Sequence, residues 1–119
     1  MTNNYTLIDP HVIQANLMQN SALITQFLQL YLVQIPVDLN ALKEAMGSKD
    51  PVEISSKAHH IKPTMEYIGA TSLRAELQEL ETAAKNGEDM QQLEKLFDIQ
   101  LPQFDTLLVE IKDYLQQLS

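Results

Sequence analysis

Apolar side chains recur along this chain at the spacing of α-helices. Around residue 60 they follow one another at intervals of 4, 3, 4 and 3, which places them on one face of a helix: Ile54, Ala58, Ile61, Met65 and Ile68. Similar series fall within residues 23–31, 39–46 and 73–84. The pattern gives no strand signal, because it lacks the period of two that a half-buried strand requires. The hydrophobic pattern therefore predicts an all-α protein whose apolar stripes form the core.

Capping and helix-breaking residues divide this pattern into segments. Helix starts are predicted at four capping sites: Asp9-Pro10, Asn20 or Ser21, Asp50-Pro51, and Thr71 or Ser72. Helix ends are predicted at three glycines: Gly47, Gly69 and Gly87. Pro36 is expected to begin a new helix. The last helical stretch, from about Met90 to Leu118, is expected to bend or break at Pro102.

The connections between these segments are short, so consecutive helices are expected to run antiparallel. We therefore predict an antiparallel four-helix bundle, preceded by a short extra N-terminal helix that ends near Leu17. The chain has 119 residues, without an internal repeat or a linker rich in proline, glycine or serine. This organisation predicts a single domain over residues 1–119.

The net charge of the chain is −8 at pH 7, which disfavours nucleic acids and anionic membranes as partners because both are bound through Lys and Arg. The absence of cysteine excludes disulfides, thiol chemistry and cysteine-ligated zinc. The first residues do not form a secretory signal, and no apolar run approaches the roughly 20 residues that span a bilayer. We expect a cytoplasmic monomer.

His59 is the main candidate for chemistry. At about 100° per residue it lies roughly 140° from the centre of the apolar face of its helix, so it is expected to be exposed. Four other residues are expected to share that exposed face: Ser55, Lys62, Pro63 and Glu66. An imidazole is a nucleophile, and an ammonium group three residues later can steady the charge of a phosphoryl group. The arrangement therefore indicates phosphoryl transfer at His59, assisted by Lys62.

The other histidines are weaker candidates. His60 lies about 100° further round the helix, so the rings of His59 and His60 are not a natural pair. A metal site there is disfavoured, because no carboxylate–histidine cluster at i, i+4 spacing completes a ligand set. His11 is expected to lie on the surface of the first short helix. A hydrolase is disfavoured by the lack of a Gly-rich phosphate loop, a nucleophile elbow or a metalloprotease motif.

Glu81 can be related to His59 by the geometry of a helical hairpin. His59 lies eleven residues before Ala70 and Glu81 lies eleven after it. On antiparallel helices, at about 1.5 Å per residue, both lie about 16 Å from the turn. Their side chains point into a shared groove, or both point away and Glu81 is a surface acid. In a shared groove Glu81 would accept a hydrogen bond from the imidazole Nδ1–H, fix the tautomer and raise the basicity of Nε2.

Three elements of the sequence together resemble the histidine-containing phosphotransfer (HPt) domain family: Ala58-His59-His60-Ile61-Lys62, Ile68-Gly69-Ala70 and Leu80-Glu81. The family pattern is Ala-His-x-Leu-Lys-Gly, then an apolar-Gly-Ala step, then Leu-Glu on the following helix, and the intervals here match without a gap. The resemblance extends over nearly the whole chain. It implies that His59 is phosphorylated, that Lys62 stabilises the phosphoryl group and that Glu81 holds the imidazole.

Pro63 departs from the family pattern, which has glycine or another small residue four positions after the histidine, where the partner approaches. Proline inside a helix loses its own hydrogen bond and crowds the carbonyl of the residue four back, here His59, at a cost of about 3 kcal/mol. The exposed position reduces this cost, because water can satisfy the freed carbonyl. Ser55, Pro63 and Glu66 are expected to lie in the docking surface for the partner.

The resemblance implies a phosphoryl carrier and not an enzyme with kinase activity of its own. His59 would relay phosphate between aspartates of response-regulator receiver domains in a multistep two-component phosphorelay, with a hybrid histidine kinase as a further partner. The receiver would supply Mg²⁺, so we expect the chain itself to need no cofactor. One alternative is a phosphorylation-incompetent helical adaptor that only docks receiver domains. Another is a domain of a hybrid sensor kinase, although Met1 and the early end of the chain favour a free-standing protein.

Overall fold

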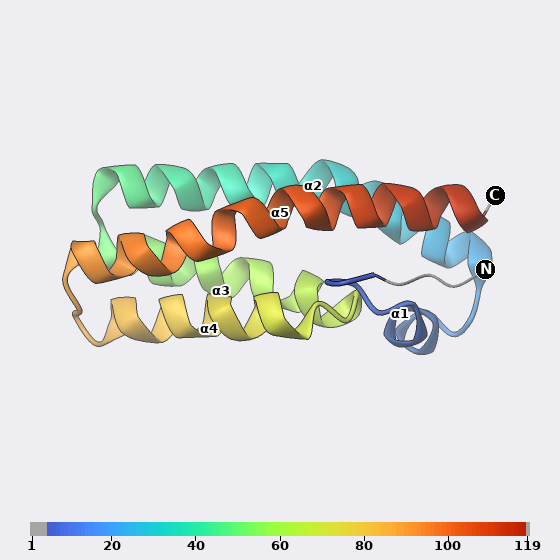
Figure 1. Cartoon of the computed structure of the whole chain (residues 1–119), viewed down its shortest axis with the longest axis horizontal. Helices are drawn as coiled ribbons and strands as arrows, with labels where there is room; N and C mark the ends of the chain where they lie inside the picture. The colour runs from blue at the N-terminus through green and yellow to red at the C-terminus, as the bar shows by residue number, and fades with distance from the viewer. Residues whose placement is uncertain (1–4, 119) are drawn as a thin grey trace.

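The computed structural model of the chain describes residues 5–118 and shows a bundle of helices without strands in that range (Figure 1). Five helices follow one another: α1 (Pro10–Asn16), α2 (Ser21–Ser48), α3 (Pro51–Tyr67), α4 (Thr71–Lys85) and α5 (Met90–Leu118). Both α3 and α5 pack against α2 and α4, so the four long helices close into a ring. Consecutive long helices run antiparallel, and the short α1 lies at one end (Figure 1). The predicted fold class is confirmed.

The apolar face predicted for the helix of His59 is part of the core. All five residues of the series from Ile54 to Ile68 are buried. From the neighbouring helix α4, Leu73, Leu77 and Leu80 are also fully buried. Burial of each large apolar side chain contributes about 1.5–3 kcal/mol, so this interface holds α3 and α4 in a fixed relation. The polar flanks of both helices are thereby placed opposite each other.

Three of the four predicted helix starts are confirmed. The side chains of Asp9, Asn20 and Asp50 accept hydrogen bonds from backbone N–H groups in the first turns of α1, α2 and α3. The start of α4 differs, because its N-cap is Ala70, which makes no side-chain hydrogen bond, and Thr71 is already helical. The prediction of Thr71 or Ser72 as the cap is therefore wrong.

The turn before α4 explains that difference. Gly69 has a φ of +72°, and a Cβ at this position would lie only 2.6 Å from the Cβ of Asp9. The backbone N–H of Asp9 donates to the carbonyl of Ile68 at 2.9 Å. The turn is thus fixed by glycine and by the N-terminal segment packed against it, without a side-chain cap.

Prolines interrupt the helices less than the sequence predicts. Helix α2 continues through Pro36 and past Gly47, and it ends at a left-handed Lys49. Helix α5 also continues through Pro102, although Figure 1 shows it bending along its length. Pro36, Pro63 and Pro102 are all exposed. Each therefore frees a carbonyl on the solvent side, where water can satisfy it and where the outward curvature of a helix makes room for the ring.

The unbroken α2 also changes the assessment of membrane-spanning segments. An 18-residue window of this helix has a mean hydropathy of 1.3 and few charges, so by length and composition alone it could cross a bilayer. The sequence analysis expected no apolar run that approaches the length of a bilayer span. The helix packs against α3 and α5. Core helices of soluble proteins pass the same test, so the window is weak grounds for a membrane span.

A buried carboxylate on α5 holds the segment that leads into α1. Glu110 accepts hydrogen bonds from the backbone N–H groups of Thr6, Leu7 and Ile8 and from the Thr6 hydroxyl, at 2.7–3.0 Å. Burial by itself raises the pKa of Glu110, but these hydrogen bonds outweigh it and lower the pKa below the usual value. The clamp fixes α1 against the carboxyl end of α3.

Candidate functional site

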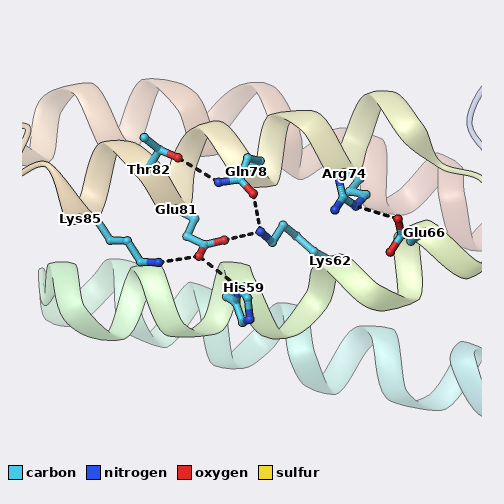
Figure 2. A network of polar contacts seen from close by, with 8 residues as sticks. All are labelled: His59, Lys62, Glu66, Arg74, Gln78, Glu81, Thr82 and Lys85. Carbon is cyan, nitrogen blue, oxygen red and sulfur yellow. Dashed lines mark hydrogen bonds and ion pairs between the residues drawn. The ribbon is translucent and has the colours of Figure 1, made fainter.

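His59 and Glu81 lie opposite each other across the groove between α3 and α4 (Figure 2). The His59 Nδ1 atom is 3.1 Å from Glu81 Oε2. The two side chains differ sharply in exposure, at 68% for His59 and 4% for Glu81. Of the two arrangements left open by the sequence, the structure therefore has the shared groove. The ring is held at Nδ1 and its Nε2 edge is directed away from that contact.

The Glu81 carboxylate binds two lysines besides the imidazole. Lys62 Nζ lies 2.7 Å from Oε1 in an ion pair, and Lys85 Nζ donates to Oε2 at 2.9 Å. Burial alone raises the pKa of Glu81, but the contacts with Lys62 and Lys85 and the charge of His59 outweigh it and lower the pKa to about 2. Glu81 is therefore a stable carboxylate at neutral pH.

Lys62 does not lie on the solvent face where the sequence analysis placed it. Its side chain is only 10% exposed and crosses the α3–α4 groove to Glu81 and to Gln78 Oε1, to which Nζ also donates (Figure 2). Around the axis of α3, Lys62 lies on the flank between the apolar and the exposed faces, and α4 covers that flank. A long aliphatic stem can lie in such an interface while its ammonium reaches a carboxylate.

The three predicted docking residues have different environments. Pro63 and Glu66 are exposed, as expected, and Glu66 lies 3.8 Å from Arg74 of α4. Ser55 is buried, so its expected place on the exposed face is wrong. Like Lys62, it sits on the side of α3 that α4 covers. Their parts in docking stay predictions.

His60 faces the opposite neighbour. Its Nε2 lies 3.5 Å from Oδ1 of Asp38 on α2, and the same oxygen accepts a hydrogen bond from Gln34 at 2.9 Å. The two consecutive histidines thus turn to different helices, as their helical angles predict. Within residues 5–118, no cluster of three or more His, Asp or Glu side chains is arranged to hold a metal ion.

Two hollows flank His59. The α3–α4 hollow has a volume of about 290 Å³ and is lined by Val52, Ser55, Ser56, His59, Glu81 and Lys85. The α2–α3 hollow has a volume of about 300 Å³ and is lined by Val37, Asp38, Ala41, Ser56, Lys57, His59 and His60. His59 therefore stands on a ridge between a hollow that contains a lysine-paired carboxylate and one that contains Asp38.

The sequence analysis missed two members of this polar network. Neither Lys85 nor Gln78 was singled out there. Lys85 lies four residues after Glu81 on the same helix, a spacing that favours an ion pair and could have been noticed. Gln78 binds Lys62 and also donates to Thr82 (Figure 2). Its role depends on Lys62 being buried, which the sequence pattern did not indicate.

Comparison with known families agrees with this geometry. The Hpt domain family matches residues 26–119, which include α3, α4, α5 and most of α2. No curated protein and no solved structure matches the chain. Domains of the matched family are typically cytoplasmic, interact with receiver domains and carry phosphoryl groups without being kinases. Because the match covers most of its length, the chain belongs to the Hpt domain family of phosphorelay signalling.

Proposed function

We propose that His59 is the phosphoryl-accepting residue and that this chain relays phosphate between aspartates of receiver domains. One observation carries the proposal: the His59 ring is 68% exposed while its Nδ1 is held by a buried carboxylate at 3.1 Å. With the proton on Nδ1, the lone pair of Nε2 is free to attack. His60 has the reverse arrangement, because its Nε2 is the atom that meets Asp38.

In the forward step, Nε2 of His59 attacks the phosphorus of a phospho-aspartate. The new N–P bond forms as the O–P bond breaks, and the aspartate leaves as a carboxylate. The ring retains its Nδ1 proton and gains positive charge, which the Glu81 carboxylate stabilises across the 3.1 Å contact. Transfer to a second receiver reverses these events.

The lysines of the groove support this chemistry by their charge. Lys62 and Lys85 both bind Glu81, so they bring two positive charges to the side of the groove that faces His59. Such charges favour the negatively charged phosphoryl group in transit. Mg²⁺ would be supplied by the acidic pocket of the receiver, and this chain would contribute no cofactor.

The docking surface would be the exposed His59 side of α3 together with the adjoining face of α2. Exposed apolar side chains supply contact area on both sides of the histidine, with Val37 in one flanking hollow and Val52 in the other. Pro63 is compact and leaves the approach to His59 free of a long side chain. Ser55 would contribute only through the lining of the α3–α4 hollow.

A phosphotransfer assay with a panel of phosphorylated receiver domains tests the proposal. The chain should acquire an acid-labile phosphate and pass it to a second receiver. His59→Gln should abolish labelling, and the matched variant His60→Gln should keep it. Labelling that survives His59→Gln would overturn the assignment. Receiver binding without any label on the wild-type chain would instead identify an adaptor that only docks.

A further inference from the structure

The α2–α3 hollow beside His59 contains a carboxylate that pairs with no lysine or arginine among residues 5–118. Asp38 is only 10% exposed at its side chain, and its recorded partners are the amide of Gln34 at 2.9 Å and the imidazole of His60 at 3.5 Å. Glu81, on the other side of His59, pairs with both Lys62 and Lys85. A buried carboxylate is costly unless it is paired, and a charge-assisted hydrogen bond from a cation offsets that cost.

The walls of this hollow suit the stem of a long side chain. Val37 and Ala41 lie on α2 at the spacing of one helical turn, and Val37 is largely exposed. Together with Asp38 they present an apolar wall next to a carboxylate. Lys and Arg have this combination of an aliphatic stem and a cationic head. A volume of about 300 Å³ is ample for one such side chain.

Resting on the proposed function, we infer that the α2–α3 hollow receives a Lys or Arg side chain of the docking receiver domain, whose cationic head pairs with Asp38. The hollow adjoins His59, so a receiver that brings its aspartate to the imidazole covers this hollow as well. This seat, the α2–α3 hollow with Asp38 at its wall, would select receivers that have a suitably placed cation. It would also fix the orientation of the receiver before transfer.

The charges around the hollow agree with a cationic occupant. Lys57 on the rim is positive, but its Nζ lies 3.8 Å from Glu53, one turn back on α3, which offsets that charge. His60 and Gln34 both contact Oδ1 of Asp38, so these two contacts leave Oδ2 to a further donor. The α3–α4 hollow is a poorer seat for a cation, because its carboxylate is already bound by two lysines.

The test compares two phosphoryl donors in Asp38→Asn, which keeps the shape of the side chain and removes its charge. The first donor is the phosphorylated receiver that exchanges fastest with the wild-type chain. The second is phosphoramidate, which labels His59 without docking. The ratio of the rate of His59 labelling by the receiver to the rate of labelling by phosphoramidate reports docking alone, because the chemistry at His59 is common to both. At a subsaturating receiver concentration this ratio should fall about tenfold in Asp38→Asn. The dependence of receiver binding on salt should also become weaker, because one ion pair is lost.

Two further variants keep the test independent of folding defects. Ala41→Arg places a guanidinium of the chain itself near Asp38, and it should lower the ratio similarly while the carboxylate remains. Asp105→Asn makes the same change in net charge at an exposed position on α5, which does not line the α2–α3 hollow, and it should leave the ratio unchanged.

Each other outcome overturns the inference. A ratio within twofold of wild type in both Asp38→Asn and Ala41→Arg removes the seat. If the ratio falls equally in Asp105→Asn, the effect belongs to the net charge of the chain. If the ratio falls in Asp38→Asn but the salt dependence of receiver binding is unchanged, the effect belongs to a change in structure and not to a lost ion pair. Absence of transfer from every receiver, despite phosphoramidate labelling of His59, would reject the proposed function and with it the occupant. Transfer from receivers at the wild-type ratio in both variants would reject the cation seat and leave the proposed function in place.

Discussion

His59 and His60 are neighbours in the sequence, have nearly equal exposure at 68% and 67%, and each contacts a buried carboxylate from an adjacent helix. The two pairs nevertheless differ in three respects. Glu81 contacts Nδ1 of its histidine and Asp38 contacts Nε2. The contact is 3.1 Å for His59 and 3.5 Å for His60. Glu81 also binds two lysines, whereas the further recorded partner of Asp38 is a neutral glutamine.

If His59 is the phosphoryl site as proposed, an imidazole beside a carboxylate does not by itself define such a site. The Glu81 pair keeps Nε2 free and gathers positive charge where a phosphoryl group would arrive. The Asp38 pair engages Nε2, and its carboxylate is not paired with a lysine as Glu81 is. On the two proposals made above, the same local motif serves chemistry on one side of α3 and recognition on the other, according to the atoms and charges that meet it.

Glu81→Gln, which weakens the His59–Glu81 pair, is expected to have the largest effect on stability. The amide still accepts from Nδ1–H, but Lys62 is left buried without its counter-charge, so the free energy of unfolding at pH 7 should fall by about 3 kcal/mol. The folded pKa of Glu81, about 2, lies below its usual value of 4.5, so its contribution is present above pH 4.5 and is lost as the pH falls toward 2. Urea unfolding of both proteins across this range measures the difference. A gap that persists at pH 2 would contradict the assignment.

Glu81→Ala provides the complementary measurement, because it removes the acceptor as well as the charge. NMR of the His59 imidazole should show a shift from the Nδ1–H tautomer toward a mixture, and transfer should be slower than in Glu81→Gln. An unchanged tautomer ratio would exclude Glu81 from orienting the ring. Asp38→Ala is the matched control, since it removes the carboxylate of the second pair and should leave the His59 tautomer as it is.

An intermediate effect is expected from the lysines of the first pair. Lys62→Ala removes a buried cation that binds both Glu81 and Gln78, and it should slow transfer about tenfold to a hundredfold. Lys85 is 64% exposed, so Lys85→Ala should change stability by less than about 1 kcal/mol and slow transfer only a few-fold. Single-turnover transfer from one receiver measures both. Equal losses in the two variants would show that burial does not set the importance of these charges.

The smallest effect is expected at Pro63, which lies on the exposed side of α3. If only access matters there, Pro63→Gly should transfer within about twofold of wild type, with a modest change in stability as the cost of proline is replaced by about 1 kcal/mol for glycine. Pro63→Arg should fold well but dock poorly, because its long side chain one turn beyond His59 would shield the imidazole. Comparing the two with one receiver decides the point. Rapid transfer by Pro63→Arg would refute the access argument, and slow transfer by Pro63→Gly would assign a role to the proline itself.

The periodicity of apolar residues was sufficient to predict the all-α fold and the apolar face of α3. It was sufficient because the burial of a helical side chain depends mainly on its position around the helix axis, and the regular period of the helix sets that position from the residue number. The antiparallel hairpin around Gly69 was enough to place Glu81 at the height of His59. The breaks predicted at Pro36 and Gly47 were wrong, since the local preference of a proline or glycine on an exposed helix face is outweighed by packing of the opposite face.

The sequence by itself thus determined the α-helical class, the apolar face of α3 and the exposed position of His59. Only the tertiary structure decided that Lys62 and Ser55 are covered by α4 and that Lys85 and Gln78 join the network. It also decided that Asp38 meets His60. These facts depend on which helix covers each flank of α3, and the distance between helices sets whether a side chain reaches water or a neighbour. A helical angle specifies a direction, but the neighbouring helices determine what lies in that direction.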